Sequence, residues 1–193
     1  MHRSSWTYRL SQLAQHHNSC KISLDGPYGD LSLKLTDYHT LFIIAGGIGI
    51  TPFINLLDIL CSERKYSNIK EVNLYWSYRE STLYDLFSEK LQKFADHSNV
   101  DSESVTEELC QNNPAITVNI FRTSSESADS SSPPSCFTFR NGRMDLEKIV
   151  RHEARVSTEK TALFVCGPSS MTRAVTKIAA AEGLEYHSEV FHY

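Results

Sequence analysis

A single stretch, residues 41–53, constrains the fold more than any other part of the chain. It begins with the apolar run Leu41–Ala45, whose lack of alternation is typical of a parallel strand covered on both faces. Gly46, Gly47 and Gly49 follow, and glycines permit positive φ and let the backbone come close to a ligand. The stretch therefore predicts a buried strand that leads into a tight glycine turn.

The residues after this turn are typical of a helix start. Thr51 can cap the helix with its hydroxyl, and Pro52 suits the first helical position. The free N–H groups of a first helical turn, together with the helix dipole, favour an anion. We therefore predict that the loop Gly46–Pro52, which includes Ile48, holds the pyrophosphate of a nucleotide on N–H groups around Ile50 and Thr51.

The same pattern has a structural alternative, which is a tight turn without a ligand. Pro52 stands where the Rossmann fingerprint has a third glycine, and no Lys-Ser or Lys-Thr pair makes the loop a P-loop. A second junction, Ala162–Pro168, also leads from an apolar run into a glycine turn, and a helix-like segment at 169–182 follows it. Two such junctions in one small α/β unit predict the two sides of one cleft.

Composition narrows the classes of function. The 193 residues carry a formal net charge of -4, which argues against a nucleic-acid groove. No stretch approaches the roughly 18 to 20 apolar residues that a membrane helix needs, and residues 1–6 do not resemble a signal peptide. The five cysteines are widely spread without a C-x-x-C pair, and the eight histidines lack ligand spacing, so we predict reduced thiols and no metal site.

Beyond residue 41, strand and helix patterns alternate, which predicts an α/β fold built on a five-stranded parallel nucleotide-binding sheet. A short helix at 6–13 and a strand at 20–24 precede it. The predicted strands of the sheet are 41–45, 71–77, 116–122, 161–166 and 185–190. The predicted helices are 52–64, 83–95, 144–152 and 169–182.

One part of the chain differs in composition. Residues 99–140 are rich in Ser, Glu, Asp, Asn and Pro, apart from the strand-like segment at 116–122. The segment 123–135 cannot bury enough apolar surface to order itself. We therefore predict a low-complexity, disordered insertion within 99–140.

Five motifs occur in one order along the chain. They are Asp25–Gly29, Gly46–Pro52, Tyr75–Arg79, Cys166–Pro168 and Glu189–Phe191. In these motifs the chain resembles the ferredoxin-NADP reductase superfamily, and within it the ferric-chelate reductase and NADPH oxidase branch. Asn141–Leu146 also resembles the Gly-Arg-Pro-Asp segment of that branch, with Met144 in place of the proline. The resemblance implies a sheet of the ferredoxin reductase type with strand order 3-2-1-4-5.

The resemblance covers the family's nicotinamide domain almost completely and its flavin domain only in part. It implies a remnant of the FAD-binding barrel at 1–36 and an NAD(P)-binding domain at 37–193. Residues 4–7 resemble the Gly-x-Trp-Thr segment that faces the flavin pyrophosphate, which makes Trp6 and Thr7 candidates for contact with FAD. The upstream flavin motif is absent from this sequence. We therefore expect a fragment, or a subunit that shares FAD with a separate flavin domain, which binds nicotinamide but does not turn over by itself.

In a sheet of that order, the loops Gly46–Pro52 and Cys166–Pro168 flank one crevice, because their strands are neighbours at the topological switch point. The pyrophosphate would rest on the first loop, and the nicotinamide would lie near Cys166 and Gly167. Cys166 is the candidate to pack against the reacting carbon as a small polarisable group, without covalent chemistry. The alternative is a buried core cysteine at a strand end.

The end of the second strand bears on the choice of cofactor. Ser77 and Arg79 offer a hydroxyl and a guanidinium suited to a 2′-phosphate, whereas an NAD site usually has an acid there. We therefore expect NADPH, with NADH as the alternative. Two other interpretations stay open: Arg79 pairs with Glu80 or Asp85 at the surface, or Glu80 serves a ribose hydroxyl.

The tail of the chain carries the remaining candidates. By resemblance, Phe191 is the aromatic side chain that stacks on the flavin, although the chain continues to Tyr193, which competes for that role. Glu189 is expected to hydrogen-bond near the reacting centre.

The resemblance implies an oxidoreductase module at the cytosolic face of a membrane. It would pass hydride from NADPH to FAD, and electrons onward to the haem of a membrane domain and then to ferric iron or oxygen. One alternative is a soluble flavin-dependent NAD(P)H reductase with another acceptor, such as an iron–sulfur centre. The other is a non-catalytic nucleotide-binding chain.

Overall fold

The computed structural model describes residues 6–16, 19, 21, 23, 32–97, 114–124, 136–157 and 159–189. Its chain divides into two units, Met1–Asp30 and Leu31–Tyr193. The first unit contains the helix α1 (Trp6–His16), in agreement with the helix expected near its start. The predicted turn Asp25–Gly29 and most of the predicted strand at 20–24 lie outside the described residues.

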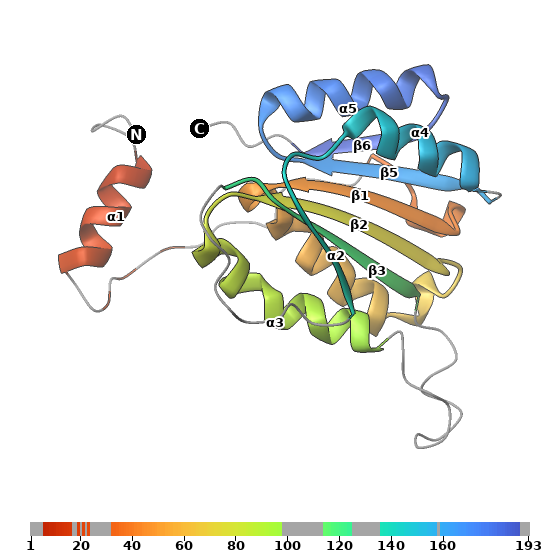
Figure 1. Ribbon diagram of the computed structural model, residues 1–193. Coiled ribbons are helices and arrows are strands. Elements are labelled where there is room, and N and C mark those ends of the chain that lie inside the picture. The colour runs from red at the N-terminus through yellow and green to blue at the C-terminus, as the bar shows by residue number, and fades with distance from the viewer. Residues whose placement is uncertain are drawn as a thin grey trace. The chain divides into compact units, whose positions relative to one another are not determined.

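The second unit is built on one parallel sheet of six strands in the order β4-β3-β2-β1-β5-β6 (Figure 1). Every neighbouring pair in it runs parallel. The strands are β1 (Thr40–Gly46), β2 (Glu71–Tyr78), β3 (Ala115–Arg122), β4 (Phe137–Asn141), β5 (Thr161–Cys166) and β6 (Glu185–Glu189). The α/β fold with a parallel sheet is therefore confirmed, with one strand more than predicted.

The additional strand β4 was not predicted, and most of it lies within the span 99–140 in which a disordered insertion was expected. Phe137 to Asn141 pair with Val118 to Arg122 of β3, and Phe137 is buried while the following residues are partly or fully exposed. A short edge strand of this kind gains its hydrogen bonds from a neighbour that is distant in sequence, so local composition did not reveal it. The rest of the predicted insertion lies largely outside the described residues.

Four helices cover the two faces of the sheet (Figure 1). α2 (Thr51–Ser62) and α3 (Ser81–His97) lie on one face, and α4 (Leu146–Val156) and α5 (Ser169–Ala181) lie on the other. The described residues of this unit also form three 3₁₀ turns: η1 (Leu35–Asp37), η2 (Gly47–Ile50) and η3 (Arg64–Tyr66). All seven residues of β1 are buried, as expected of a strand covered on both sides.

Alternation along β1 divides the core between the two faces. Leu41, Ile43 and Ala45 belong to the larger cluster, which packs under α2 and α3, whereas Phe42 and Ile44 belong to the cluster under α4 and α5. The chain builds outward from β1 to β4 on one side and then places β5 on the other. The carboxyl ends of β1 and β5 therefore meet at a topological switch point, where ligands bind in open α/β sheets.

The described residues include neither a membrane-spanning helix nor a metal-binding cluster. None of the helices in this part of the chain is long and apolar enough to cross a membrane. The same residues hold no group of three or more His, Cys, Asp or Glu side chains that could bind a metal ion.

Candidate functional site

The glycine loop after β1 is a 3₁₀ turn that runs directly into α2. Gly47 has φ of 57°, which is the left-handed conformation that glycine tolerates best. The Trp76 indole Nε1 donates to the Gly47 carbonyl oxygen over 3.0 Å. Thr51 does not cap the helix, which corrects our prediction, because its hydroxyl donates over 2.8 Å to the carbonyl oxygen of Ile48 within the turn.

This turn shifts the expected anion-binding groups toward the start of the loop. The helical run begins at Gly47, so the N–H groups of its first turn belong to Gly47–Gly49 rather than to Ile50 and Thr51. Ile50 has no exposed surface and belongs to the core. Ile48 is 45% exposed and Thr51 is also exposed, so these residues remain accessible to a ligand.

The structure brings the loop after β1 and the loop after β5 into contact. A Cβ on Gly49 would lie 2.4 Å from the carbonyl oxygen of Cys166. A Cβ on Gly46 would lie 2.8 Å from Cδ of Pro168 and 2.9 Å from Cε of Met171. Real Cβ atoms cannot approach so closely, so these two glycines allow the loops to meet.

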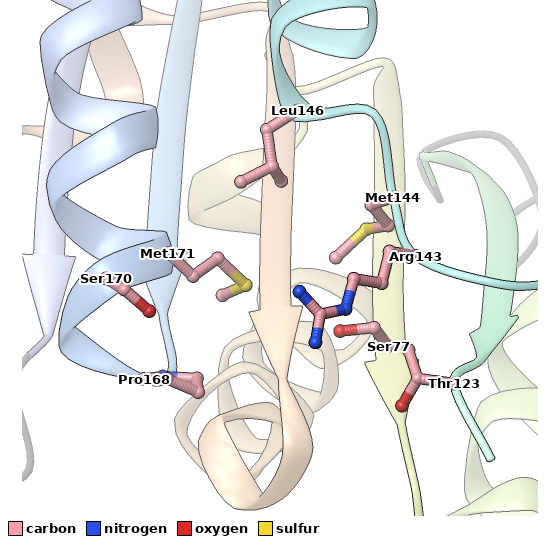
Figure 2. A pocket seen from close by; sticks show the side chains of 8 residues that line it. All are labelled: Ser77, Thr123, Arg143, Met144, Leu146, Pro168, Ser170 and Met171. Carbon is pink, nitrogen blue, oxygen red and sulfur yellow. The ribbon is translucent and has the colours of Figure 1, made fainter.

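A pocket of about 360 Å³ opens beside this contact, at the carboxyl ends of the strands (Figure 2). Its lining combines three hydroxyl groups and one guanidinium with four apolar side chains. Such a mixture suits a ligand with a flat apolar part and an anionic part. The lining residues are Ser77, Thr123, Arg143, Met144, Leu146, Pro168, Ser170 and Met171.

Arg143 is the cation of the pocket. Figure 2 shows its guanidinium extending into the space between Met171 and Ser77. Among the ion pairs of the described residues, none involves Arg143. Arg143 belongs to the motif Asn141–Leu146, but the sequence alone predicted no role for it. Strand β4 was not predicted. If it had been, the loop after it would have been expected at the same edge of the sheet as Ser77 and Pro168.

The residues at the end of β2 differ in their access to the pocket. Ser77 lines it, whereas Tyr78 is buried in the core and Arg79 is exposed at the bend that follows the strand. No ion pair joins Arg79 to Glu80 or Asp85 in the part of the chain that the structure describes. Arg79 therefore lies just beyond Ser77 with its charge toward solvent.

Cys166 ends β5 as a core residue. It has no exposed surface and belongs to the cluster under α2 and α3. Burial raises the pKa of its thiol to about 11, and the nearby Glu189 carboxylate adds to the rise. The thiol is therefore neutral at physiological pH and unsuited to act as a nucleophile. A ligand ring could reach it only after neighbouring side chains moved.

Glu189 lies beside Cys166, because the two residues are partners in the β5–β6 register. Its side chain is 46% exposed. Phe191 and Tyr193 lie outside the described residues. Trp6 begins α1 with 73% exposure, and Thr7 follows it in that helix of the first unit.

The chain is similar in sequence to several known proteins. Residues 38–180 match the family model described as the ferric reductase NAD binding domain. The chain is 41% identical to ferric reduction oxidase 8, mitochondrial, of Arabidopsis thaliana over 69 residues. These residues make up 36% of this chain and 9% of that protein. Over 198 residues it is 24% identical to NADPH oxidase 4 of Homo sapiens, covering 97% of this chain and 33% of that protein.

A third similar protein is ferric reductase transmembrane component 1 of Schizosaccharomyces pombe. It is 28% identical over 171 residues, which cover 86% of this chain and 29% of that protein. The chain thus spans about a third or less of the length of these relatives.

Proposed function

We propose the following function for this chain, which belongs to the ferric reductase NAD-binding domain family: it binds NADPH and presents the nicotinamide for hydride transfer to a flavin. The family consists of NAD(P)H-dependent oxidoreductases. The observation that carries the proposal is the contact between the loops after β1 and β5, beside a pocket that holds an Arg143 guanidinium.

The adenosine end of NADPH would occupy the pocket. Met144 and Leu146 offer apolar surface to an adenine ring. Because a dinucleotide fold meets the adenosine ribose at the end of its second strand, Ser77 would meet the 2′-phosphate there. Arg143 would then pair with the same phosphate, and Arg79 would complete the cationic rim, since a guanidinium matches phosphate geometry.

The pyrophosphate would rest on the loop Gly46–Pro52, where the N–H groups of Gly47–Gly49 begin the helical run. The nicotinamide would extend toward Gly167 and Pro168, with Cys166 behind them and Glu189 alongside. When bound, NADPH supplies the hydride. The residues of this chain hold the nicotinamide in one orientation and exclude water, and Cys166 takes no covalent part.

The larger assembly is also a proposal. Of the barrel remnant expected at 1–36, the first unit, Met1–Asp30, would belong to a flavin-binding part that supplies FAD, with Trp6 and Thr7 toward it, whereas residues 31–36 belong to the second unit. Electrons would continue to haem and then to ferric iron or oxygen at the cytosolic face of a membrane. Similar proteins named as ferric reductases and an NADPH oxidase support this assembly. We expect the isolated chain to bind NADPH without turnover.

Calorimetric titration of two arginine variants tests the cofactor assignment. Arg79→Ala and Arg143→Ala should each weaken NADPH binding by roughly tenfold to a hundredfold and NADH binding much less, because NADH lacks the 2′-phosphate. Arg155→Ala is the matched control, since Arg155 is exposed in the last turn of α4, away from the pocket. Equal losses for both cofactors would contradict the assignment of the 2′-phosphate.

A further inference from the structure

A chain of hydrogen bonds runs from Ser32 through His187 of β6 to Glu189, the last residue of that strand. Ser32 Oγ lies 2.7 Å from Nδ1 of His187, and the backbone N–H of Ser32 donates to the same nitrogen over 3.2 Å. On the other side of the ring, Nε2 of His187 lies 3.0 Å from Oε1 of Glu189. His187 therefore links the segment that precedes β1 to the end of β6.

The imidazole ring of His187 is held from several sides. Its side chain is only 11% exposed, and its ring packs on Phe164 of β5 with centroids 5.7 Å apart. The start of β6 is fixed as well, because the hydroxyl of Tyr38 donates to Glu185. Folding alone therefore orders the His187 side chain, and no ligand is needed.

The contacts also determine where the ring carries its proton. A backbone N–H can only donate, so Nδ1 of His187 must accept from Ser32. In the neutral ring the single N–H is then on Nε2, from which it donates to the Glu189 carboxylate. This donor leaves the second carboxylate oxygen of Glu189 free to accept from another group.

We propose that Ser32 and His187 are positioning residues that hold the Glu189 carboxylate toward the carboxamide of nicotinamide. This inference rests on the proposed function. Glu189 is half-exposed and lies beside Cys166 at the end of the sheet where the nicotinamide would enter. A carboxylate is an acceptor for the carboxamide NH₂ group, and a fixed carboxylate loses less entropy on binding than a mobile one.

Two substitutions of His187 separate its two contacts. The amide of Asn reaches about as far as imidazole Nδ1, so His187→Asn keeps an acceptor for Ser32 and loses the donor to Glu189. The amide nitrogen of Gln reaches about as far as Nε2, so His187→Gln keeps the donor to Glu189. His152→Asn is the control for the substitution itself, because His152 is exposed on α4.

The affinities of the full 193-residue chain for NADPH and for adenosine 2′,5′-bisphosphate, which lacks nicotinamide, are measured by calorimetry. His187→Asn should weaken NADPH binding by about threefold to tenfold and leave binding of the bisphosphate unchanged. His187→Gln should restore most of the NADPH affinity, and His152→Asn should resemble the unmodified chain. In ¹⁵N spectra of the unmodified chain, His187 should carry its proton on Nε2.

Several results would overturn the inference. They are equal losses for both ligands in His187→Asn, an unchanged affinity for NADPH in that variant, failure of His187→Gln to restore it, or a proton on Nδ1. Failure of the proposed function looks different, because the unmodified chain would then not bind NADPH at all.

Discussion

The indole Nε1 of Trp76 donates a hydrogen bond of 3.0 Å to the carbonyl oxygen of Gly47, which ties the centre of the sheet to the glycine loop. Trp76 has no exposed surface, and the rings of Tyr78, Tyr84 and Phe87 pack around it. The left-handed conformation of Gly47 is therefore supported by the core of the domain as well as by the turn itself.

The substitution Trp76→Phe should loosen this loop. It removes the only side-chain donor of Trp76 and leaves the Gly47 carbonyl without that hydrogen bond, so the free energy of unfolding should fall by about 1 to 3 kcal/mol in urea denaturation. NADPH affinity should fall as well. Phe87→Leu is the control, because the Phe87 ring packs edge-on against the same indole and has no hydrogen-bond donor to offer the loop. An NADPH affinity as high in Trp76→Phe as in Phe87→Leu would contradict a role for this hydrogen bond.

Two glycines of the loop should respond differently to alanine. Nothing lies within 4 Å of a Cβ on Gly47, so Gly47→Ala should cost only the strain of its positive φ, about 1 to 2 kcal/mol. A Cβ on Gly49 would collide with the backbone of Cys166, so Gly49→Ala should destabilise the domain further by forcing the two loops apart. Thermal unfolding of both variants measures the difference. A larger loss for Gly47→Ala would mean that the loops do not meet as described.

The Cys166 thiol should make the folded state less stable in alkali. Burial raises its pKa from 9.0 to about 11, so between these values the unfolded chain loses the proton and the folded chain keeps it. The contribution is complete below pH 9 and is lost as the pH rises toward 11, on the order of 2 kcal/mol. Urea denaturation from pH 8 to 11 should therefore show a steeper decline in the unmodified chain than in Cys166→Ser. Parallel declines would show that Cys166 ionises normally in the folded state.

The sequence predicted the parts of the fold that depend on local pattern. The apolar run Leu41–Ala45 lies inside β1, and the glycine turn follows it because a buried strand must leave the sheet before α2 can begin. We also predicted that the loops after β1 and β5 flank one crevice, from the two strand-to-glycine-turn junctions and from the strand order that the family resemblance implies.

The missed features depend on contacts between distant residues. β4 is stabilised by its register with β3, and its polar surroundings concealed Phe137 and Phe139. The pocket joins Ser77 of β2 to side chains that follow β3, β4 and β5, so no local motif could assign Arg143 to it. Thr51 failed as a cap because the 3₁₀ turn begins the helical run four residues earlier, at Gly47.

Hydrogen–deuterium exchange of the 193-residue chain, with and without NADPH, tests the central claim that NADPH binds where the loops after β1 and β5 meet. NADPH should slow exchange in Gly46–Pro52, in residues 142–146 and in Cys166–Met171. Exchange should be unchanged at the opposite end of the sheet, in residues 67–70. Equal exchange in all three segments at saturating NADPH, or slowing confined to other parts of the chain, would contradict the account.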